Sequence, residues 1–511
     1  MTQRRLALPK SWCSACVRDT GQYINGFAFK PAHWDSVGTP IIRIKNLTDP
    51  TREYKKTTFD APASARIQPG DILVSWAATL DAFLWKGEPA FLNRHIFRVV
   101  PDERLVRPKF LFYLLKWVMW ELARTEHLHG STSRHINRGP LMSFPVAIPP
   151  MNEQISIVHE IEKHFTRLDA AVDALKRVKA NLRRYRAATL KAACEGRLVP
   201  TEASLARRRH RAYESASLLL GRILADRRSR MKNGRSCEPT PPVANERLKL
   251  PEGWTRASIE QVSFLVQYGS SAKTNENPDG IPVLRMGNLT SDGRIDSDEL
   301  KYLPRDHDDF PALLLDSGDL LFNRTNSAEL VGKSAVYSGN PNPCSFASYL
   351  IRVKILPGCD SRYVALCFNS ILGRAWIKSV VSQQVGQANV NGTKLQAFAI
   401  PLPPKHEQAR ILAEVERRLF LVDKQEALID EELVRAPRLR QAILKKFFCG
   451  GLIPRTGTTN LQACFLRESV LRKRVRGGSL PRKRIIRETQ PDPLTFGNYR
   501  QHRRNSKKLG G

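Results

Sequence analysis

Two polar segments of the chain contain the side chains best suited to binding a nucleic acid. The first spans residues 130–137 and the second spans residues 383–391. Their hydroxyl and amide groups can bind phosphates and base edges, and arginine or glutamine can form paired hydrogen bonds with guanine or adenine. A polar surface loop with turn chemistry has the same composition, so both interpretations stand. The candidate residues are Ser131, Thr132, Ser133, Arg134 and Asn137 in the first segment, and Gln384, Gln387, Asn389 and Asn391 in the second.

Basic and amide residues elsewhere extend this candidate set. Arginine is a stronger candidate than lysine because its planar guanidinium can carry sequence information. The Asn-Leu-Thr runs that begin at Asn46 and Asn288 would also be explained by a turn after a strand. The further candidates are Arg43, Lys45, Asn46 and Arg94, followed by Arg285, Asn288, Asn323 and Arg324.

The charge of the whole chain favours a polyanionic partner. The 511 residues include 82 Lys and Arg against 49 Asp and Glu, which gives a net charge of +33. Neutralised phosphates release counterions, so such an excess favours nucleic acid. No apolar run is long enough to span a membrane, and no apolar segment follows the first arginines, so we expect no secretory signal. The nine scattered cysteines are typical of reduced thiols, so we expect a cytoplasmic protein.

An internal repeat shows which elements must position the candidate residues. The segment 38–48 (GTPIIRIKNLT) returns as 280–290 (GIPVLRMGNLT), an offset of 242 residues. The offset rises by six residues twice, as loop insertions would make it do, and then holds from Arg98 to Pro200. The chain is therefore two copies of one domain-sized unit, at about 8–200 and 250–454.

Each copy begins with alternating short strands and helices. In the first copy the β-branched runs 40–44, 72–75 and 96–100 predict strands, and 108–124 predicts a helix. The fold class expected is therefore α/β (mixed α+β), present twice.

Each copy ends in a long helix with an apolar seam. The first helix follows Pro150 and the second follows Pro404, and each would be about 42 residues, or roughly 63 Å, long. Two such seams are buried if the helices pair as an antiparallel coiled coil. The seam of the first helix drifts at Val178, Leu182 and Tyr185. The seam residues expected are Val158, Ile161, Phe165, Leu168, Val172 and Leu175, and then Leu412, Val415, Leu419, Val422, Ile429, Leu433, Leu439 and Ile443.

The motifs of enzymes and metal sites are weak or missing. The segment 269–274 lacks the glycines of a P-loop, and Pro278-Asp279 with 299–301 is only a loose nuclease pattern that the first copy does not share. Cys13-x-x-Cys16 has no second pair at zinc spacing. There is also no Asn/Asp-Pro-Pro-aromatic tetrad of a methyltransferase. We expect no catalytic residues, no metal and no cofactor in this chain.

The order of these features resembles the specificity subunits of type I restriction–modification enzymes. The shared motifs are Leu-Pro-x-x-Trp, Arg-x-x-Asn-Leu-Thr, Gly-Asp-(Ile/Leu)-Leu, and Pro-Pro-x-x-Glu-Gln leading a long helix, each present twice within 8–454. The central insert around 218–228 is also similar to that family. The resemblance implies target-recognition domains at 1–150 and 250–404. It implies helical regions at 151–249, with a basic linker, and 405–454, while the basic tail 455–511 lies outside it.

The resemblance also implies partners. Each target-recognition domain would read one half of a split, asymmetric target in double-stranded DNA. Two methylation subunits would supply the S-adenosylmethionine chemistry, and restriction subunits would cleave DNA with ATP. Two alternatives remain at this point: an enzyme with its own nuclease or methyltransferase centre, and a coiled-coil adaptor whose charge only keeps it in solution.

Overall fold

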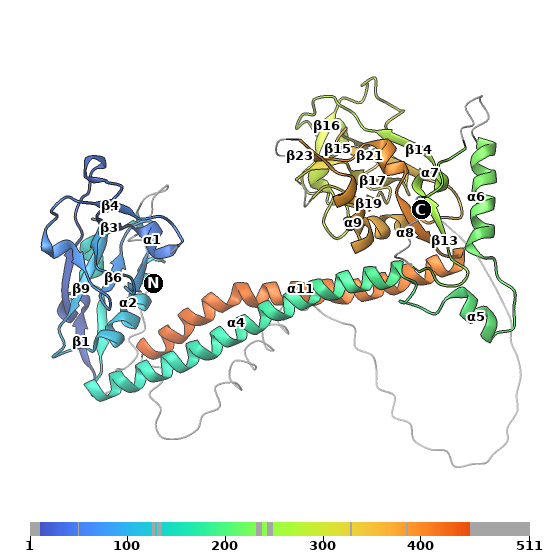
Figure 1. Ribbon diagram of the computed structural model, residues 1–511. Helices are drawn as coiled ribbons and strands as arrows, with labels where there is room; N and C mark the ends of the chain where they lie inside the picture. Colours follow the sequence, from blue (N-terminus) through green and yellow to red (C-terminus); the bar gives the residue numbers. More distant parts are fainter. Residues whose placement is uncertain are drawn as a thin grey trace, which may run out of the picture. The chain divides into compact units, whose positions relative to one another are not determined.

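The computed structural model describes residues 11–49, 51–124, 128–129, 135–230, 238–242, 249–327, 330–384 and 387–449. Within them, both copies have the mixed α/β fold that the sequence predicts, each followed by a long helix (Figure 1). In the first copy the strands are β1 (Cys13–Cys16), β2 (Gly21–Asn25), β3 (Thr39–Ile42), β4 (Lys55–Thr57), β5 (Arg66–Ile67), β6 (Ile72–Ser75), β7 (Asp81–Leu84), β8 (Ala90–Leu92), β9 (Ile96–Pro101), β10 (Leu128–His129), β11 (His135–Ile136) and β12 (Pro145–Ile148). Its helices are α1 (Ile44–Thr48), α2 (Pro108–Leu122) and α3 (Arg138–Met142).

The second copy repeats this order with small insertions. Its strands are β13 (Thr255–Ser258), β14 (Ser263–Tyr268), β15 (Ile281–Leu284), β16 (Lys301–Leu303), β17 (Leu320–Asn323), β18 (Thr325–Asn326), β19 (Ser334–Val336), β20 (Ser345–Phe346), β21 (Leu350–Ile355), β22 (Ser382–Gln384), β23 (Gln387–Asn389) and β24 (Ala399–Leu402). Its helices are α7 (Ile259–Val262), α8 (Ser361–Asn369), α9 (Ile371–Val380) and α10 (Gly392–Gln396).

The sheets of the two copies match strand by strand. The antiparallel sheet β2-β9-β6-β7 of the first copy corresponds to β14-β21-β17-β19 of the second. A second sheet places β3 parallel to β8, as the other copy places β15 parallel to β20. In each copy the first and last strands also pair, β1 with β12 and β13 with β24. The chain therefore enters and leaves each globular part through two adjacent, paired strands.

The repeated Gly-Asp and Arg-Val motifs stabilise this fold. Gly70 and Gly318 turn the chain before β6 and β17 with φ values of +98° and +95°, a conformation that favours glycine. The aspartate that follows each glycine pairs with an arginine of the neighbouring strand. Asp71 lies 3.2 Å from Arg98, and Asp319 lies 3.5 Å from Arg352, measured between charged atoms. These motifs recur because both copies need the same turn and ion pair.

The repeated Trp and Glu-Gln motifs join each globular part to its long helix. These helices are α4 (Met151–Cys194) and α11 (Lys405–Phe448). The Trp12 indole donates to Glu153 at 2.8 Å, and the Trp254 indole donates to Glu407 at 2.9 Å. Burial raises the pKa of the Glu407 carboxyl above its usual range, even though its hydrogen bonds and Arg410 oppose that shift.

Gln408 supplies a further buried part of this junction. Its side chain accepts from the Asp360 N–H at 2.9 Å and donates to the carbonyl oxygens of Gly358 and Pro403. Gln154 makes the same three kinds of bond in the first copy.

Replacing Gln408 by Ala should lower the free energy of unfolding by about 2–3 kcal/mol, because three backbone groups lose their buried partner. Chemical denaturation of the purified full-length chain measures this change. Gln408→Glu keeps the acceptor and loses the donors, so it should also destabilise the fold. A Gln408→Ala change below about 0.5 kcal/mol would contradict the assignment.

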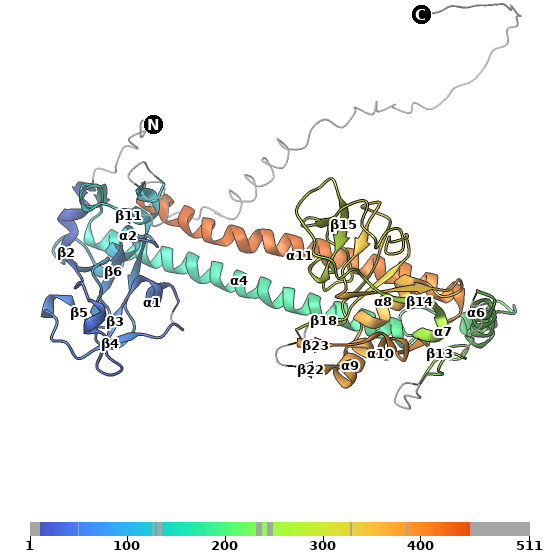
Figure 2. The ribbon, with the colours of Figure 1, turned by 90° about the horizontal axis from the view of Figure 1, so that it is seen from above.

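The long helices pair in antiparallel register (Figures 1 and 2). Asp169 pairs with Arg440, Lys179 with Asp430 and Arg186 with Asp423. Residue numbers therefore increase along α4 while they decrease along the facing part of α11. The buried side chains of α11 fall at heptad spacing through the middle of the helix, at Val415, Val422, Ile429 and Ala436. The predicted antiparallel pairing is thus present.

The predicted seam is wrong in one detail and misses one buried position. The seam of α4 does not drift toward Val178 and Tyr185, which are exposed. Its heptads continue through Lys179 and Arg186, whose charges meet acidic residues of α11. On α11, Ala436 is a further buried position that the sequence did not suggest, and Leu439 is partly buried. Charged seam residues hid the register because an apolar pattern records only apolar positions.

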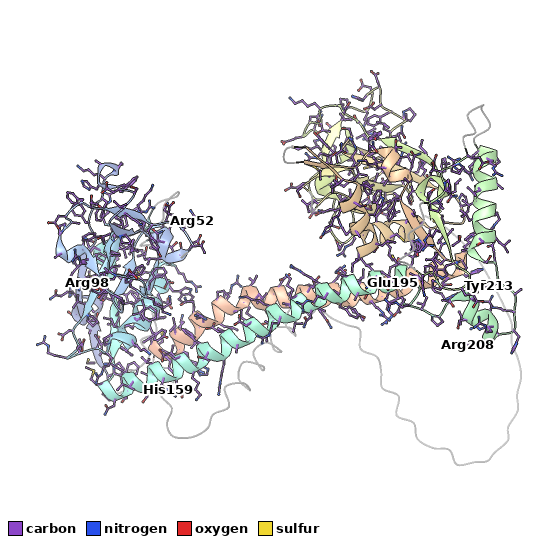
Figure 3. All side chains as sticks on the ribbon, viewed as in Figure 1. Arg52, Arg98, His159, Glu195, Arg208 and Tyr213 are labelled. Carbon is purple, nitrogen blue, oxygen red and sulfur yellow. The ribbon has the colours of Figure 1, made fainter. Side chains whose placement is uncertain are left out.

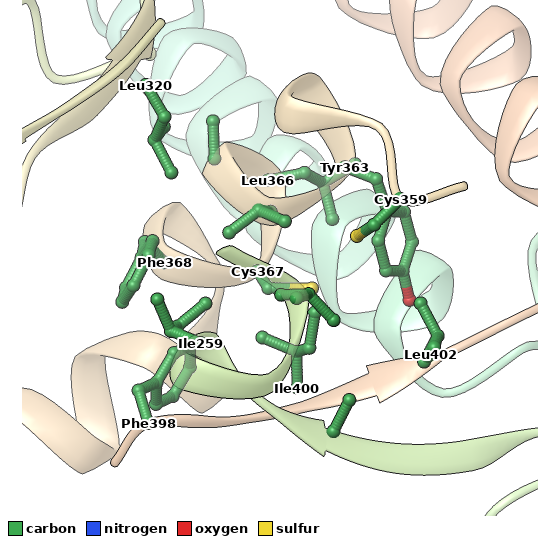
Figure 4. Packing of buried hydrophobic residues seen from close by; sticks show 14 of the residues in the cluster. Ile259, Leu320, Cys359, Tyr363, Leu366, Cys367, Phe368, Phe398, Ile400 and Leu402 are labelled. Carbon is green, nitrogen blue, oxygen red and sulfur yellow. The ribbon is translucent and has the colours of Figure 1, made fainter. Parts of the chain in front are cut away.

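Each globular part contacts both long helices. In the first copy, Phe110 and Trp117 of α2 contact Phe448 near the end of α11, with ring centroids 5.5 and 5.9 Å apart. In the second copy, the main hydrophobic core includes Ala193 and Cys194 of α4 together with Ile411 of α11. Part of that core, with Tyr363, Phe368 and Phe398, is shown in Figure 4.

The central segment is more helical than the sequence suggests. The insert around 218–228 lies within a helix, α6 (Ala216–Arg230), and a second helix, α5 (Glu202–Arg208), fills part of the basic linker. Leu219 and Ile223 of α6 belong to the core of the second copy. The cysteines in the described ranges are free thiols, and none of the described helices is long and apolar enough to cross a membrane.

Candidate nucleic-acid interface

In the first copy, the ends of several strands meet at one edge. The chain leaves β3 at Arg43, and the Asn93 N–H after β8 donates to the Ile42 carbonyl at 3.0 Å. The Trp76 carbonyl after β6 accepts from the Ile136 N–H at 3.0 Å. The edge therefore brings together candidates that lie far apart in the sequence. They are Arg43, Arg94 and Asn137.

The second copy forms the same edge with the same backbone bonds. The Ala347 N–H after β20 donates to the Leu284 carbonyl at 2.8 Å, next to Arg285. The Arg324 carbonyl after β17 accepts from the Val390 N–H at 2.9 Å. This edge gathers the second set of candidates, Arg285, Arg324, Asn389 and Asn391.

Arg43 and Arg285 occupy equivalent positions in the two edges. Both precede a helical turn, and the backbone N–H of each donates to an asparagine side chain three residues later. The Nε atom of each is buried and has no hydrogen-bond partner within the described part of the chain. Burial also lowers the pKa of the Arg43 guanidinium. Each copy thus places one arginine with unused donors at the same point.

Positive charge is concentrated around Arg43. Lys45 is exposed, and the charge of Arg43 lowers the pKa of its ammonium, followed by smaller effects of burial, Arg52 and Lys55. Arg52 is labelled on the same globular part in Figure 3. Cations held this close favour an anion between them, such as a phosphate of a nucleic-acid backbone.

The side chains at the two edges differ between the copies. In the first copy, the Nε of exposed Arg94 lies 3.1 Å from His95 Nε2, and the His95 ring packs against Trp76 with centroids 5.1 Å apart. Burial, and then the Arg94 charge, lowers the pKa of His95. In the second copy, the Arg324 guanidinium lies over the Tyr268 ring, 4.8 Å from its centroid.

The amide residues that cap the following helices remain candidates. Asn137 is exposed at the start of α3 and makes no capping bond with its side chain. The exposed Asn391 accepts from the Lys394 N–H at 2.9 Å, which leaves its amide NH₂ free of any capping role. Asn389 lies 3.4 Å from the Thr325 hydroxyl. All three therefore present polar groups near the two edges.

Three sequence candidates have structural roles instead. Asn46 and Asn288 are buried, and their amides bond to backbone carbonyls of the same loop, those of Arg52 and Glu53 and those of Asp296 and Glu299. Asn323 is fully buried in β17. The predicted strand 40–44 also ends at Ile42 and gives way to α1, so the simpler turn interpretation of Asn-Leu-Thr is the better one. We withdraw these three residues as proposed contacts.

Other candidates lie outside what the structure describes. Ser131, Thr132, Ser133 and Arg134 fall in residues 130–134, which are not described. Gln384 and Gln387 lie on β22 and β23, but only their backbone is described. These six residues keep the status of predictions.

Sequence reasoning missed the aromatic members of both edges. Trp76 and His95 in the first copy, and Tyr268 and Tyr349 in the second, are partly or largely exposed beside the candidate arginines. Alignment of the two copies could have identified these positions. Trp76 aligns with Arg324 and His95 aligns with Tyr349, so the residue type differs between the copies at each position. Aromatic rings beside arginines are common in nucleic-acid sites, where they stack on bases.

The weak enzyme motifs gain no support from the described residues. A P-loop needs a helix after the glycine-rich turn, whereas the segment after β14 leads to strand β15. No group of three or more His, Cys, Asp or Glu side chains that could hold a metal occurs in the described ranges.

Comparison with known proteins also finds the same unit twice in the chain. The family model for the type I restriction modification DNA specificity domain matches residues 9–182 and again residues 251–432. The chain belongs to this family. The specificity domain is therefore present twice, and each copy of it includes one globular part and most of one long helix.

Relatives of known name match most of the chain. The EcoBI specificity subunit of Escherichia coli is 22% identical over 459 residues, which cover 88% of this chain and 87% of the relative. The EcoKI specificity subunit of Escherichia coli strain K12 is 22% identical over 460 residues, which cover 87% and 90%. A solved chain from a study of complex assembly and conformational transition of the type I R-M system is similar in fold, with a TM-score of 0.54, 17% identity and coverage of 88% and 100%.

Proposed function

We propose that this chain is the specificity subunit of a type I restriction–modification complex. It reads a split, asymmetric target in double-stranded DNA, with one half bound by each copy of the specificity domain. It has no catalytic residues and no cofactor of its own. Two methylation subunits and the restriction subunits supply the chemistry, in the cytoplasm, at the site that this chain selects.

One observation carries the proposal. The residues that build the fold are shared between the copies, as in Asp71–Arg98 and Asp319–Arg352. The residues exposed at the two edges differ, as in Trp76 and Arg324. A duplicated enzyme would be expected to keep the same reactive groups at both sites. Two domains that recognise different DNA sequences need the same backbone fold and different side chains at the contacts with bases.

Arg43 and Arg285 are the proposed phosphate contacts because both copies have them. A phosphate contact carries no sequence information, so it is the kind of contact that two different readers can share. Lys45 and Arg94 extend the basic surface of the first edge. Asn137, Asn389 and Asn391, together with the six residues whose side chains are not described, complete the proposed interface.

Replacing Arg43 and Arg285 by Ala should weaken binding to every DNA sequence by a similar factor. The slope of log K against log salt should become shallower by about 0.9 for each phosphate that the variant no longer neutralises. Fluorescence anisotropy with the purified complex of this chain and its methylation subunits measures both quantities.

Arg18→Ala is the matched control, since exposed Arg18 precedes β2 at the end away from Asn25 and the edge. It should leave affinity and salt slope unchanged. A double variant that binds with the unchanged slope would remove these arginines from the interface. A wild-type complex that prefers no sequence over any other would instead favour the adaptor function.

A further inference from the structure

The two edges place different side chains in one shared backbone frame. The Arg324 N–H donates to the Tyr349 carbonyl at 3.0 Å, and the Arg324 carbonyl accepts from the Val390 N–H at 2.9 Å. In the first copy, the Trp76 N–H donates to the His95 carbonyl at 3.4 Å and the Trp76 carbonyl accepts from the Ile136 N–H at 3.0 Å. Arg324 and Trp76 are therefore equivalent positions with unlike chemistry.

The guanidinium of Arg324 is held in place by an aromatic ring. Its Cζ atom lies 4.8 Å from the centroid of Tyr268. The Tyr268 hydroxyl accepts from the Gly392 N–H at 2.7 Å, which fixes the ring against α10. A stacked guanidinium loses less freedom when it binds, and it keeps its donor edge available.

The donors of Arg324 are unused within the described part of the chain. Among the described residues its guanidinium contacts the Tyr268 ring, and neither a hydrogen bond from its Nη groups nor an ion pair with an acidic side chain is found; its Nε is buried without a partner. By contrast, Arg352 on neighbouring β21 bonds to the carbonyl oxygens of Leu314 and Ala312. Within the described ranges the Nε of Arg352 is also buried without a partner, so the difference lies in the two Nη groups, which bond to the fold in Arg352 and not in Arg324.

We propose that Arg324 recognises a guanine in the half-site bound by the second copy. This inference rests on the proposed function. Guanine presents two acceptors, N7 and O6, on its major-groove edge, and a guanidinium can donate to both. Trp76 cannot make this contact, because an indole has one donor and no fork of donors. Arg324 thus helps to make the two half-sites different.

Three variants in the full system separate base reading from phosphate binding. Arg324→Lys keeps the charge and loses the planar fork, Arg324→Ala loses both, and Arg285→Ala removes the neighbouring arginine that both copies share. The readout is the methylated sequence in a host that carries the methylation subunit and each variant, mapped across the genome. Methylation rates on DNA with the guanine replaced then give the discrimination.

The expected result is a change at one base pair. Arg324→Lys and Arg324→Ala should each reduce discrimination at one G·C pair of one half-site by roughly ten- to a hundredfold, and leave the other half unchanged. Arg285→Ala should lower methylation of all sites with the motif unchanged. Tyr268→Phe keeps the ring but loses the hydroxyl bond to Gly392, so it should reduce this selectivity less than Tyr268→Ala, which should shift it toward that of Arg324→Ala.

Other results overturn the proposal. An Arg324→Lys complex that still requires every base equally, or a half-site without a G·C pair at the affected position, would exclude guanine reading. An assembled Arg324→Lys complex that loses all methylation would assign Arg324 to overall affinity. If the methylated motif of the wild type does not depend on this chain at all, the proposed function fails. That outcome is distinct from the results that exclude guanine recognition by Arg324 alone.

Discussion

Exchanging residues 13–148 for the matching segment of another specificity subunit should replace one half of the methylated target and leave the other half intact. The structure makes this segment a natural module, because Cys13 and Ile148 are partners on the paired strands β1 and β12. The segment therefore begins and ends at one place. Trp12 and Glu153, which join the globular part to α4, lie outside it and are retained.

The exchange must respect the helices that the segment contacts. Lys109 and Tyr113 of α2 bond to Glu162 of α4, and Glu121 pairs with Lys445 of α11. A donor with apolar residues at Phe110 and Trp117 should keep the contact with Phe448. Mapping of methylated sites in cells reads the outcome. Changes in both halves would show that the two copies do not read independently.

Replacing Ile429 by Pro should abolish methylation of the split target. Proline in a helix interior removes a backbone hydrogen bond and clashes with the preceding turn, at a cost of about 3 kcal/mol or more. Ile429 is also only 6% exposed in the seam between α4 and α11. Both readers depend on these helices, so a break in the middle should disturb their alignment. Thermal unfolding and methylation assays of the complex measure the two effects.

Neighbouring Leu428 provides a matched set of controls. It is 55% exposed, so Leu428→Ala should change stability by less than about 0.5 kcal/mol, whereas Ile429→Ala should cost about 2 kcal/mol or more. Leu428→Pro should destabilise the chain less than Ile429→Pro, because it removes no buried side chain, but it should also abolish methylation, because it breaks the same helix. Unchanged recognition of the same split target by either proline variant would refute the role of the helices in spacing the readers.

The repeat and the long helices could be predicted from the sequence because their signals are local. The runs 72–75 and 96–100 coincide with β6 and β9 to within a residue, and the helices begin directly after Pro150 and Pro404. The heptad register was harder to read in the middle of α4. There Lys179 and Arg186 occupy seam positions, and only the partner helix reveals the acids that accept them.

The interface was less predictable because it is assembled from distant segments. Arg43, Arg94 and Asn137 were identified singly, but only the pairing of β3 with β8 and the bond from Ile136 to Trp76 bring them to one edge. Asn46 and Asn288 looked like contacts because polar type alone does not reveal burial. Trp76 and Tyr268 escaped notice because an isolated aromatic residue is usually part of a core.

Genome-wide methylation mapping, with and without this chain, tests the central claim most directly. The host would express a methylation subunit of the same system. We predict a split, asymmetric motif that disappears when this chain is deleted and returns when it is restored. A motif that persists without the chain, or one that is continuous and symmetric, would contradict the account.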